Sequence, residues 1–107
     1  MIGLLTTYAF YAYTRCVGFE WDDLKQVRNL KDHGIDFFEC EDVFEDLLAI
    51  IRSDLDHSLG EHRFIIVGRS RKGRVLLTVF AERGKEIRII SSRRATRREV
   101  RDYEKGV

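Results

Sequence analysis

The fold of this 107-residue chain is decided by residues 63–94, which read RFIIVGRSRKGRVLLTVFAERGKEIRIISSRR. Three segments of this stretch, 64–67, 75–81 and 86–91, are rich in β-branched and large apolar residues, as is typical of strands. Short polar turns that contain a glycine separate the three segments. Because parallel neighbours need long crossover connections, such short spacings predict an antiparallel meander.

Segments upstream of this stretch extend the predicted sheet. Residues 47–51 are apolar enough to begin the meander, so that it has four strands. Residues 54–61 are polar and contain Gly60, which predicts a loop. Residues 17–21 alternate briefly and predict one further short strand near the N-terminus.

A first helix is predicted from Asp22, an N-cap residue, to the residue before Gly34, which is a natural helix stop. Leu24, Val27 and Leu30 repeat at helical spacing between these two signals. This stripe predicts an amphipathic, rather polar helix that lies on the surface of the core.

A second helix is predicted to begin at Asp36, which forms a capping-box-like pair with Glu39. Its apolar stripe consists of Phe37, Cys40, Val43, Phe44 and Leu47. The other side of this helix is acidic and consists of Glu39, Glu41, Asp42, Glu45 and Asp46. We interpret this acidic side as a solvated helix face.

A last helix over 97–105 is predicted from Thr96, an N-cap residue, with Glu99 at the third helical position. The element order predicts an α+β fold in which two N-terminal helices and a C-terminal helix pack on one face of the antiparallel four-stranded meander. We expect a single domain over residues 19–107, with the aromatic residues 1–18 outside the core fold.

The charges of the chain are divided unevenly between its halves. Residues 1–56 contain 5 basic and 12 acidic side chains, whereas residues 57–107 contain 14 basic and 6 acidic ones. This asymmetry predicts an acidic scaffold that carries a basic working face. Two cysteines, Cys16 and Cys40, make neither a disulfide framework nor a metal-type pair, which favours a reducing, cytoplasmic setting.

Arginines are concentrated on the meander and its turns, where lysine is scarce. Arginine is better suited than lysine to two-pronged contact with phosphate, so we expect the exposed sheet face to handle RNA phosphates. Regular alternation in the last strand predicts that Ser91 and Arg93 share one face with Ile87 and Ile89, and that Arg88 and Arg94 share the other. About half of the arginines are expected to pair instead with Glu61, Glu82, Glu86 and Glu99.

Three kinds of cleavage chemistry fit these residue types. His57 and His62 could form an acid/base pair, and with Asp54, Asp56 and Glu61 they could hold a divalent metal ion, although their spacing matches no fixed signature. The third kind relies on arginines, with Glu82 or Tyr103 nearby. RNA carries its own nucleophile, and alignment alone contributes about 7–11 kcal/mol, compared with about 10²–10⁴-fold in rate from general acid–base catalysis. These magnitudes favour the arginine mechanism, with no metal or cofactor.

Four segments together resemble the BrnT toxin family across roughly residues 19–103. They are Phe19-Glu20-Trp21-Asp22, Asn29-Leu30-x-x-His33-Gly34, Asp56-His57-Ser58-x-Gly60-Glu61-x-Arg63 and Arg88-Ile89-Ile90-Ser91-x-Arg93-x-Ala95-x-x-x-Glu99. The resemblance implies a RelE-like, metal-independent ribonuclease toxin of a type II toxin–antitoxin module. It also implies growth arrest and a partner antitoxin, BrnA, bound in a hetero-oligomer that reaches DNA only through the antitoxin.

The resemblance further implies roles for side chains on the basic half. Arg63, Arg83 and Arg93 would be phosphate or transition-state ligands, Glu82 would be a base, and Tyr103 would stack on a base or donate a proton. Further RNA-binding arginines would be Arg69, Arg74, Arg88, Arg94 and Arg97. The alternative is a non-catalytic basic module that only binds an antitoxin-like partner or nucleic acid.

Overall fold

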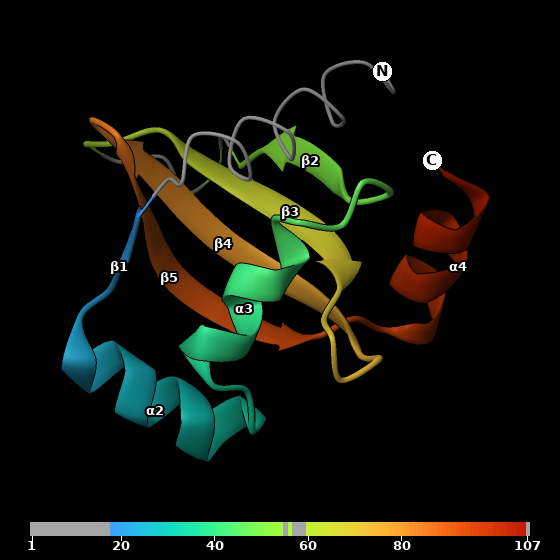
Figure 1. Cartoon of the computed structure of the whole chain (residues 1–107), viewed down its shortest axis with the longest axis horizontal. Helices are drawn as coiled ribbons and strands as arrows, with labels where there is room; N and C mark the ends of the chain where they lie inside the picture. Colours follow the sequence, from blue (N-terminus) through green and yellow to red (C-terminus); the bar gives the residue numbers. More distant parts are fainter. Residues whose placement is uncertain (1–17, 55, 57–59, 107) are drawn as a thin grey trace.

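The central feature of the fold is a sheet with the strand order β1-β5-β4-β3-β2 (Figure 1). The computed structural model describes residues 18–54, 56 and 60–106. The elements are β1 (Gly18–Glu20), α2 (Asp23–His33), α3 (Phe37–Val43), β2 (Ile50–Ser53), β3 (Arg63–Arg69), β4 (Val75–Arg83), β5 (Glu86–Arg94) and α4 (Arg97–Lys105). The antiparallel meander from β2 to β5 is confirmed. However, β1 joins it as a parallel neighbour of β5, so the described sheet is five-stranded and mixed. None of the helices in these ranges is long and apolar enough to cross a membrane.

Helix α2 has the predicted ends but not the predicted contact with the core. The Asp22 side chain accepts from the backbone N–H groups of Leu24 and Lys25, and Gly34 ends the helix at φ 71°. The predicted apolar stripe is wrong as a core contact, because Leu24, Val27 and Leu30 are 71%, 65% and 48% exposed.

A polar residue attaches α2 to the sheet instead. Asn29 is buried, and its Oδ1 accepts from the backbone N–H of Ser92 at 2.9 Å, while its Nδ2 donates to Ile35 O at 3.0 Å. The helix therefore lies along β5 and satisfies a strand N–H, which explains why its apolar stripe faces solvent.

Helix α3 supplies the main core on one face of the sheet. Phe37, Cys40, Val43 and Phe44 are buried against the sheet, as predicted. The helix ends at Val43, so Leu47 is 59% exposed and the first meander strand begins at Ile50 rather than at residue 47. Packing is close, since a Cβ on Gly68 of β3 would lie 2.7 Å from Val43 Cγ1.

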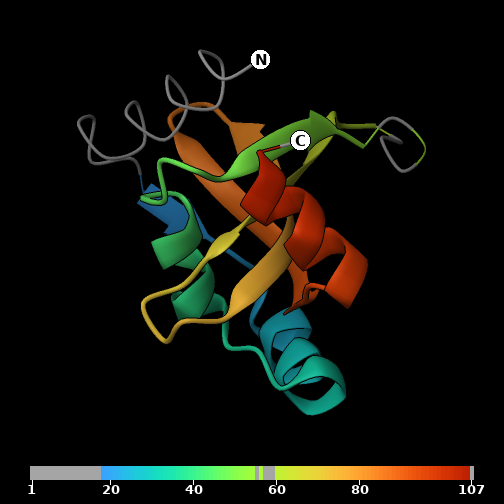
Figure 2. The ribbon, with the colours of Figure 1, turned by 90° about the vertical axis from the view of Figure 1, so that its right-hand side faces the viewer.

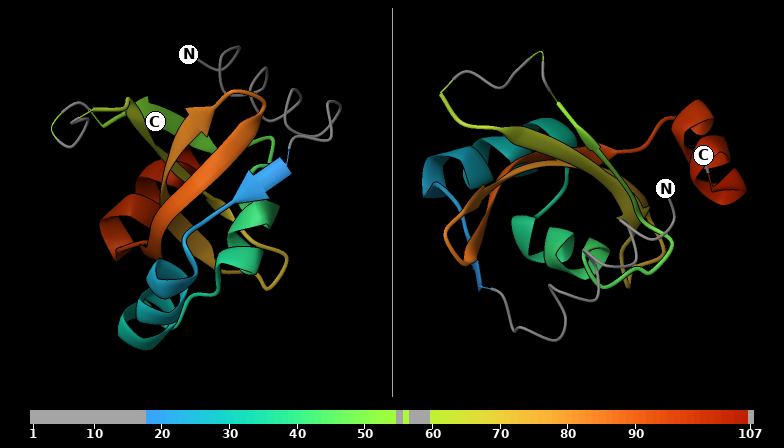
Figure 3. Two further views of the ribbon diagram at one scale, coloured as in Figure 1. Left: turned by 90° about the vertical axis from the view of Figure 1, so that its left-hand side faces the viewer. Right: turned by 90° about the horizontal axis from the view of Figure 1, so that it is seen from above.

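Helix α4 packs on the opposite face, which corrects the prediction that all helices share one face (Figures 2 and 3). In β4, Leu76 and Phe80 belong to the core under α3, whereas Val75 and Leu77 pack with Tyr103 of α4. Apolar residues thus occur at both alternating positions of the central strands, as in sheets that are covered on both faces.

A β-bulge changes which side chains of β5 share a face. Val79 pairs with Ser91 and Phe80 pairs with Ile89, so Ile90 is an additional residue. Beyond the bulge, Ser92 contacts Thr78 on the side of the α3 core, with 2.9 Å between the hydroxyl oxygens. The predicted alternation of β5 is therefore wrong, because the bulge brings Ser91 and Arg93 to the face on which Arg88 lies.

The acidic side of α3 and the turn after it hold the β3–β4 hairpin, so the prediction of a solvated face is also wrong. Asp46 Oδ2 accepts from the backbone N–H of Arg69 at 2.8 Å, and Asp42 Oδ2 accepts from that of Arg71 at 3.0 Å. Glu39 is buried, forms a two-pronged ion pair with Arg74 and accepts from the Ser70 hydroxyl at 2.7 Å. Carboxylates from the acidic N-terminal half of the chain are therefore paired with groups of the basic C-terminal half inside the fold.

Candidate nucleic-acid interface

The sheet face opposite α3 carries arginines beyond the part that α4 covers. One row of paired residues crosses the sheet from β2 to β5 and consists of Arg52, Ile65, Val79 and Ser91. The next row toward the 54–62 connection pairs Arg63 of β3 with Ala81 and Arg88. We call the surface formed by Arg52, Arg63, Arg88, Ser91 and Arg93 the arginine face.

The cations on the arginine face differ in how they are held. Arg52 is exposed and Arg88 is half-buried, and neither makes an ion pair or side-chain hydrogen bond with another residue of the described ranges. Arg63 is half-buried, and its Nε is enclosed. The guanidinium groups of Arg52 and Arg88, on strands that the sheet holds rigidly, are suited to binding phosphate oxygens.

Arg93 is fixed by a carboxylate of α4. Its Nη1 and Nη2 lie 2.8 and 3.0 Å from Oε1 and Oε2 of Glu99. This ion pair lowers the pKa of Glu99 to about 2, against the opposing effect of burial, and raises the pKa of Arg93. The Glu99 carboxylate also accepts from the Thr96 backbone N–H at 2.8 Å, which completes the predicted capping box. Arg93 therefore stays charged, and one carboxylate both orients it and begins α4.

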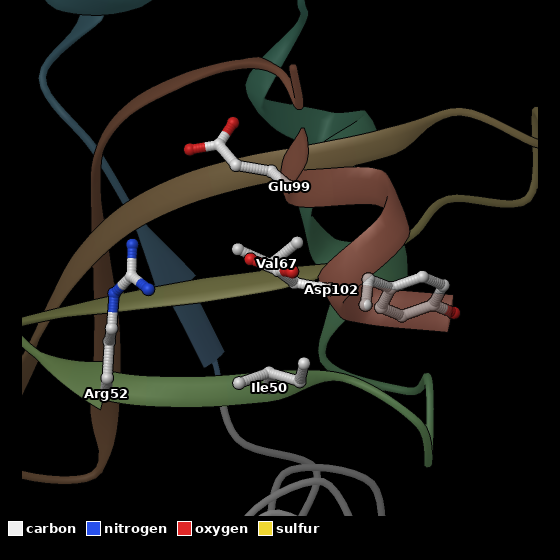
Figure 4. Close-up of a pocket in the computed structure, with 6 residues that line it drawn as sticks. Ile50, Arg52, Val67, Glu99 and Asp102 are labelled. Atoms are coloured by element: carbon white, nitrogen blue, oxygen red, sulfur yellow. The ribbon is translucent and has the colours of Figure 1, made fainter. Parts of the chain in front are cut away.

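Two pockets adjoin the arginine face. One lies between β2 and α4 and is lined by Ile50, Arg52, Val67, Glu99, Asp102 and Tyr103 (Figure 4). The other, of about 240 Å³, lies between α2 and β5 and is lined by Lys25, Arg28, Asn29, Asp32, His33, Ile90 and Ser91. Arg52 and Ser91 belong both to the arginine face and to one of these pockets, so the surface between α2 and α4 is continuous with both.

Several predicted RNA-binding arginines lie elsewhere. Arg69, Arg74 and Arg94 line a separate pocket of about 480 Å³ at the β3–β4 turn and the end of β5. Arg74 is held by Glu39, and Arg69 donates from Nη1 to Gly73 O at 2.9 Å and lies over the Tyr103 ring. Arg97 is exposed at the first position of α4. Of the five residues predicted to bind RNA, only Arg88 lies on the arginine face.

Two residues predicted to be catalytic lie at the far end of β4. Glu82 pairs with Ile87, whose side chain is in the α3 core, so Glu82 projects from the opposite face to Arg63. Arg83 projects from the same face as Arg63, but at its far margin, where its Nε lies 3.8 Å from Glu20 Oε1. The structure therefore does not bring Glu82 together with the arginines that it was predicted to assist.

Tyr103 occupies a structural position between α4 and the sheet. It is 7% exposed, and its hydroxyl donates to Asp46 Oδ2 at 2.6 Å. Burial and the neighbouring Asp46 carboxylate raise the pKa of Tyr103 to about 12. A buried phenol that already donates to a carboxylate is poorly placed to donate a proton to RNA.

The histidines and carboxylates of the 54–62 connection are only partly described. His62 is exposed and stacks on Phe64 with 4.4 Å between ring centroids. His57 lies outside the described residues, so its predicted pairing with His62 is not tested. Within the described ranges, no three His, Cys, Asp or Glu side chains are arranged to hold a metal ion.

Arg52 and Ser91 were missed by sequence reasoning. Arg52 lies two residues after Ile50 in β2, so the two side chains share a face. That face could be assigned only once the pairing of β2 with β3 was known. Ser91 was assigned to the face of Ile87 and Ile89, and no residue pattern marked the bulge that moves it.

Comparison with known proteins first defines the fold. The chain is similar to the crystal structure of the Brucella abortus ribonuclease toxin BrnT, with a TM-score of 0.59, 24% identity, and coverage of 76% of this chain and 99% of that one. No curated protein sequence matches the chain significantly. The family described as "Ribonuclease toxin, BrnT, of type II toxin-antitoxin system" matches residues 21–99. The chain belongs to the BrnT family of ribonuclease toxins, whose type II systems pair each toxin with an antitoxin.

Proposed function

We propose that this toxin is a RelE-like, metal-independent endoribonuclease whose arginine face binds the phosphates around the scissile bond. The observation that supports the proposal best is the convergence of Arg63, Arg88 and Arg93 on one face of the sheet, where Glu99 holds Arg93 in a two-pronged ion pair. We also propose that the toxin acts in the cytoplasm, which is consistent with the free thiol of the buried Cys40.

The proposed reaction uses the nucleophile that RNA supplies. The 2′-oxygen attacks the adjacent phosphorus and loses its proton, while the bond to the 5′-oxygen breaks and that oxygen takes up a proton. The products are a 2′,3′-cyclic phosphate and a free 5′-hydroxyl. Cations held against the sheet stabilise the additional negative charge on the phosphoryl oxygens as this transition state forms. Rigid strands align the phosphate with the 2′-oxygen, which contributes about 7–11 kcal/mol in well-oriented reactions.

An RNA cleavage assay in the presence of EDTA tests this proposal. Arg63→Ala and Arg88→Ala are compared with wild type and with Arg101→Ala, a matched loss of an exposed arginine on α4. We expect cleavage by wild type and Arg101→Ala to resist EDTA, and each arginine-face variant to lose at least about tenfold in rate. Cleavage that requires a divalent ion would refute metal independence, and RNA binding without any cleavage would favour the non-catalytic module.

We further propose that a BrnA-like antitoxin neutralises the toxin in a hetero-oligomer by covering the arginine face. Its occupant must complement the positive charge of Arg52, Arg63 and Arg88. Competition between the co-expressed antitoxin and a fluorescent RNA tests the shared surface. If the toxin binds the antitoxin and the RNA at the same time, the two do not share the arginine face.

A further inference from the structure

The pocket between α2 and β5 extends the arginine face toward the N-terminal half of the chain. Lys25, Arg28, Asp32 and His33 recur along one side of α2, and Ile90 and Ser91 come from the bulged part of β5. The bulge is what turns Ser91 toward this pocket and toward the arginine face at once. Such a location next to the predicted phosphate ligands is where a nucleotide beside the scissile bond would lie.

The side chains that line this pocket are chemically varied and available. Asn29 is engaged with β5, but Lys25, Arg28 and Asp32 make no side-chain ion pair or hydrogen bond with other described residues. Arg28 and Asp32 are one helical turn apart on the same side of α2, and both side chains remain available to a ligand. The guanidinium of Arg28 and the imidazole of His33 are planar groups on which a base can stack.

We propose that this pocket binds a guanine base of the RNA substrate, with the Asp32 carboxylate accepting from its Watson–Crick edge. The inference rests on the proposed function and adds a base-selecting site to it. Guanine presents two adjacent donors, N1–H and the 2-amino group, which match the two oxygens of one carboxylate. Cytosine and adenine present one amino group each, and uracil presents only its N3–H. Lys25 and Arg28 then contact the flanking phosphate and offset the charge of Asp32.

Binding of non-cleavable 2′-O-methyl hexanucleotides separates this inference from cleavage. Each oligonucleotide carries one guanosine, one inosine or one additional uridine in a uridine background, because inosine lacks only the 2-amino group of guanosine. Fluorescence anisotropy gives the Kd for wild type, for Asp32→Asn and for Asp23→Asn, which is a matched control on the same helix outside the pocket.

We expect wild type and Asp23→Asn to bind the guanosine oligonucleotide about tenfold more tightly than the inosine one, because a hydrogen bond to a charged group is lost. Asp32→Asn should bind all three oligonucleotides with nearly equal Kd. Equal affinity of wild type for guanosine and inosine, or a preference that survives Asp32→Asn, overturns the guanine site and leaves the proposed ribonuclease function standing. If wild type binds none of the oligonucleotides, the arginine face and the guanine site are both refuted.

Discussion

Arg93 of β5 and Glu99 of α4 form a two-pronged ion pair, with nitrogen–oxygen distances of 2.8 and 3.0 Å. The same carboxylate accepts from the Thr96 backbone N–H, so it joins the strand end, the helix start and a cation of the arginine face. Glu99 therefore orients Arg93 and links the start of α4 to the sheet.

Glu99→Gln should lower stability at neutral pH but not in strong acid. The folded pKa of about 2 lies below the ordinary value of 4.5, so the stabilisation is complete above about pH 4.5 and is lost as the pH falls through 2. Because the Arg93 side chain is 40% exposed, we expect a loss of only about 1–2 kcal/mol at pH 6. Urea unfolding between pH 2 and 7 measures the difference, and a difference that is independent of pH contradicts the assignment.

Arg74→Ala should destabilise the fold far more than Arg71→Ala. The Glu39 carboxylate that Arg74 binds is only 2% exposed. Without Arg74 this buried charge keeps only the Ser70 hydroxyl and the more distant, exposed Lys72 ammonium at 3.9 Å, which should cost about 2–4 kcal/mol. Arg71 also binds a carboxylate, Glu45, but its side chain is 74% exposed, so its loss should barely move the urea midpoint. Equal midpoints for the two variants would contradict a structural role for the pair between Arg74 and Glu39.

Arg52→Ala and Arg88→Ala should each reduce the salt dependence of RNA binding. Each phosphate contact adds about 0.7 to the slope of log K against log salt for a single strand, so each loss should lower that slope by about this amount. Arg98→Ala, an exposed arginine on α4, should leave the slope unchanged. Titration of a non-cleavable oligonucleotide at several salt concentrations gives the slopes, and an unchanged slope for Arg88→Ala would remove it from the interface.

Tyr103→Phe should reduce stability while preserving RNA cleavage. The variant loses the 2.6 Å hydrogen bond to Asp46, which should cost about 1–2 kcal/mol because that acceptor is charged. Cleavage by the folded variant should stay within about threefold of wild type, since general acid–base catalysis would be worth at least about 10². A hundredfold loss of cleavage by folded protein would restore the catalytic role of Tyr103.

Val27→Ala and Val43→Ala compare the two predicted helix stripes directly. Val43 is fully buried in the α3 core, so its truncation should cost about 1–3 kcal/mol. Val27 is 65% exposed, and its truncation should change stability by less than about 0.5 kcal/mol. Thermal unfolding measures both changes, and a large effect at Val27 would show that its helix face is covered in solution.

Local signals in the sequence were sufficient for most elements. Asp22 and Gly34 marked the two ends of α2, Thr96 and Glu99 marked the start of α4, and the glycine turns predicted the meander. These features depend on neighbouring residues, because helix caps and tight turns involve groups only a few positions apart. The buried stripe of α3 followed from helical spacing in the same way, except at Leu47, where the helix had already ended.

Contacts between distant residues could not be predicted in this way. Glu39 and Arg74 both look like surface charges in the sequence, and only the packing of α3 on the sheet makes them a buried pair. Likewise, β1 showed strand alternation, but nothing near it indicated that it would pair with β5 in parallel.

The sequence by itself determined an arginine-rich antiparallel meander with capped helices, and its motifs already resembled those of the BrnT family. Only the tertiary structure decided which arginines share a surface. Five positions separate Arg88 from Arg93, which in a regular strand would place them on opposite faces. The bulge at Ile90 inserts one residue and reverses that parity, and α4 then covers part of the same face. Because strand register and helix placement depend on long-range packing, the arginine face is a property of the folded chain.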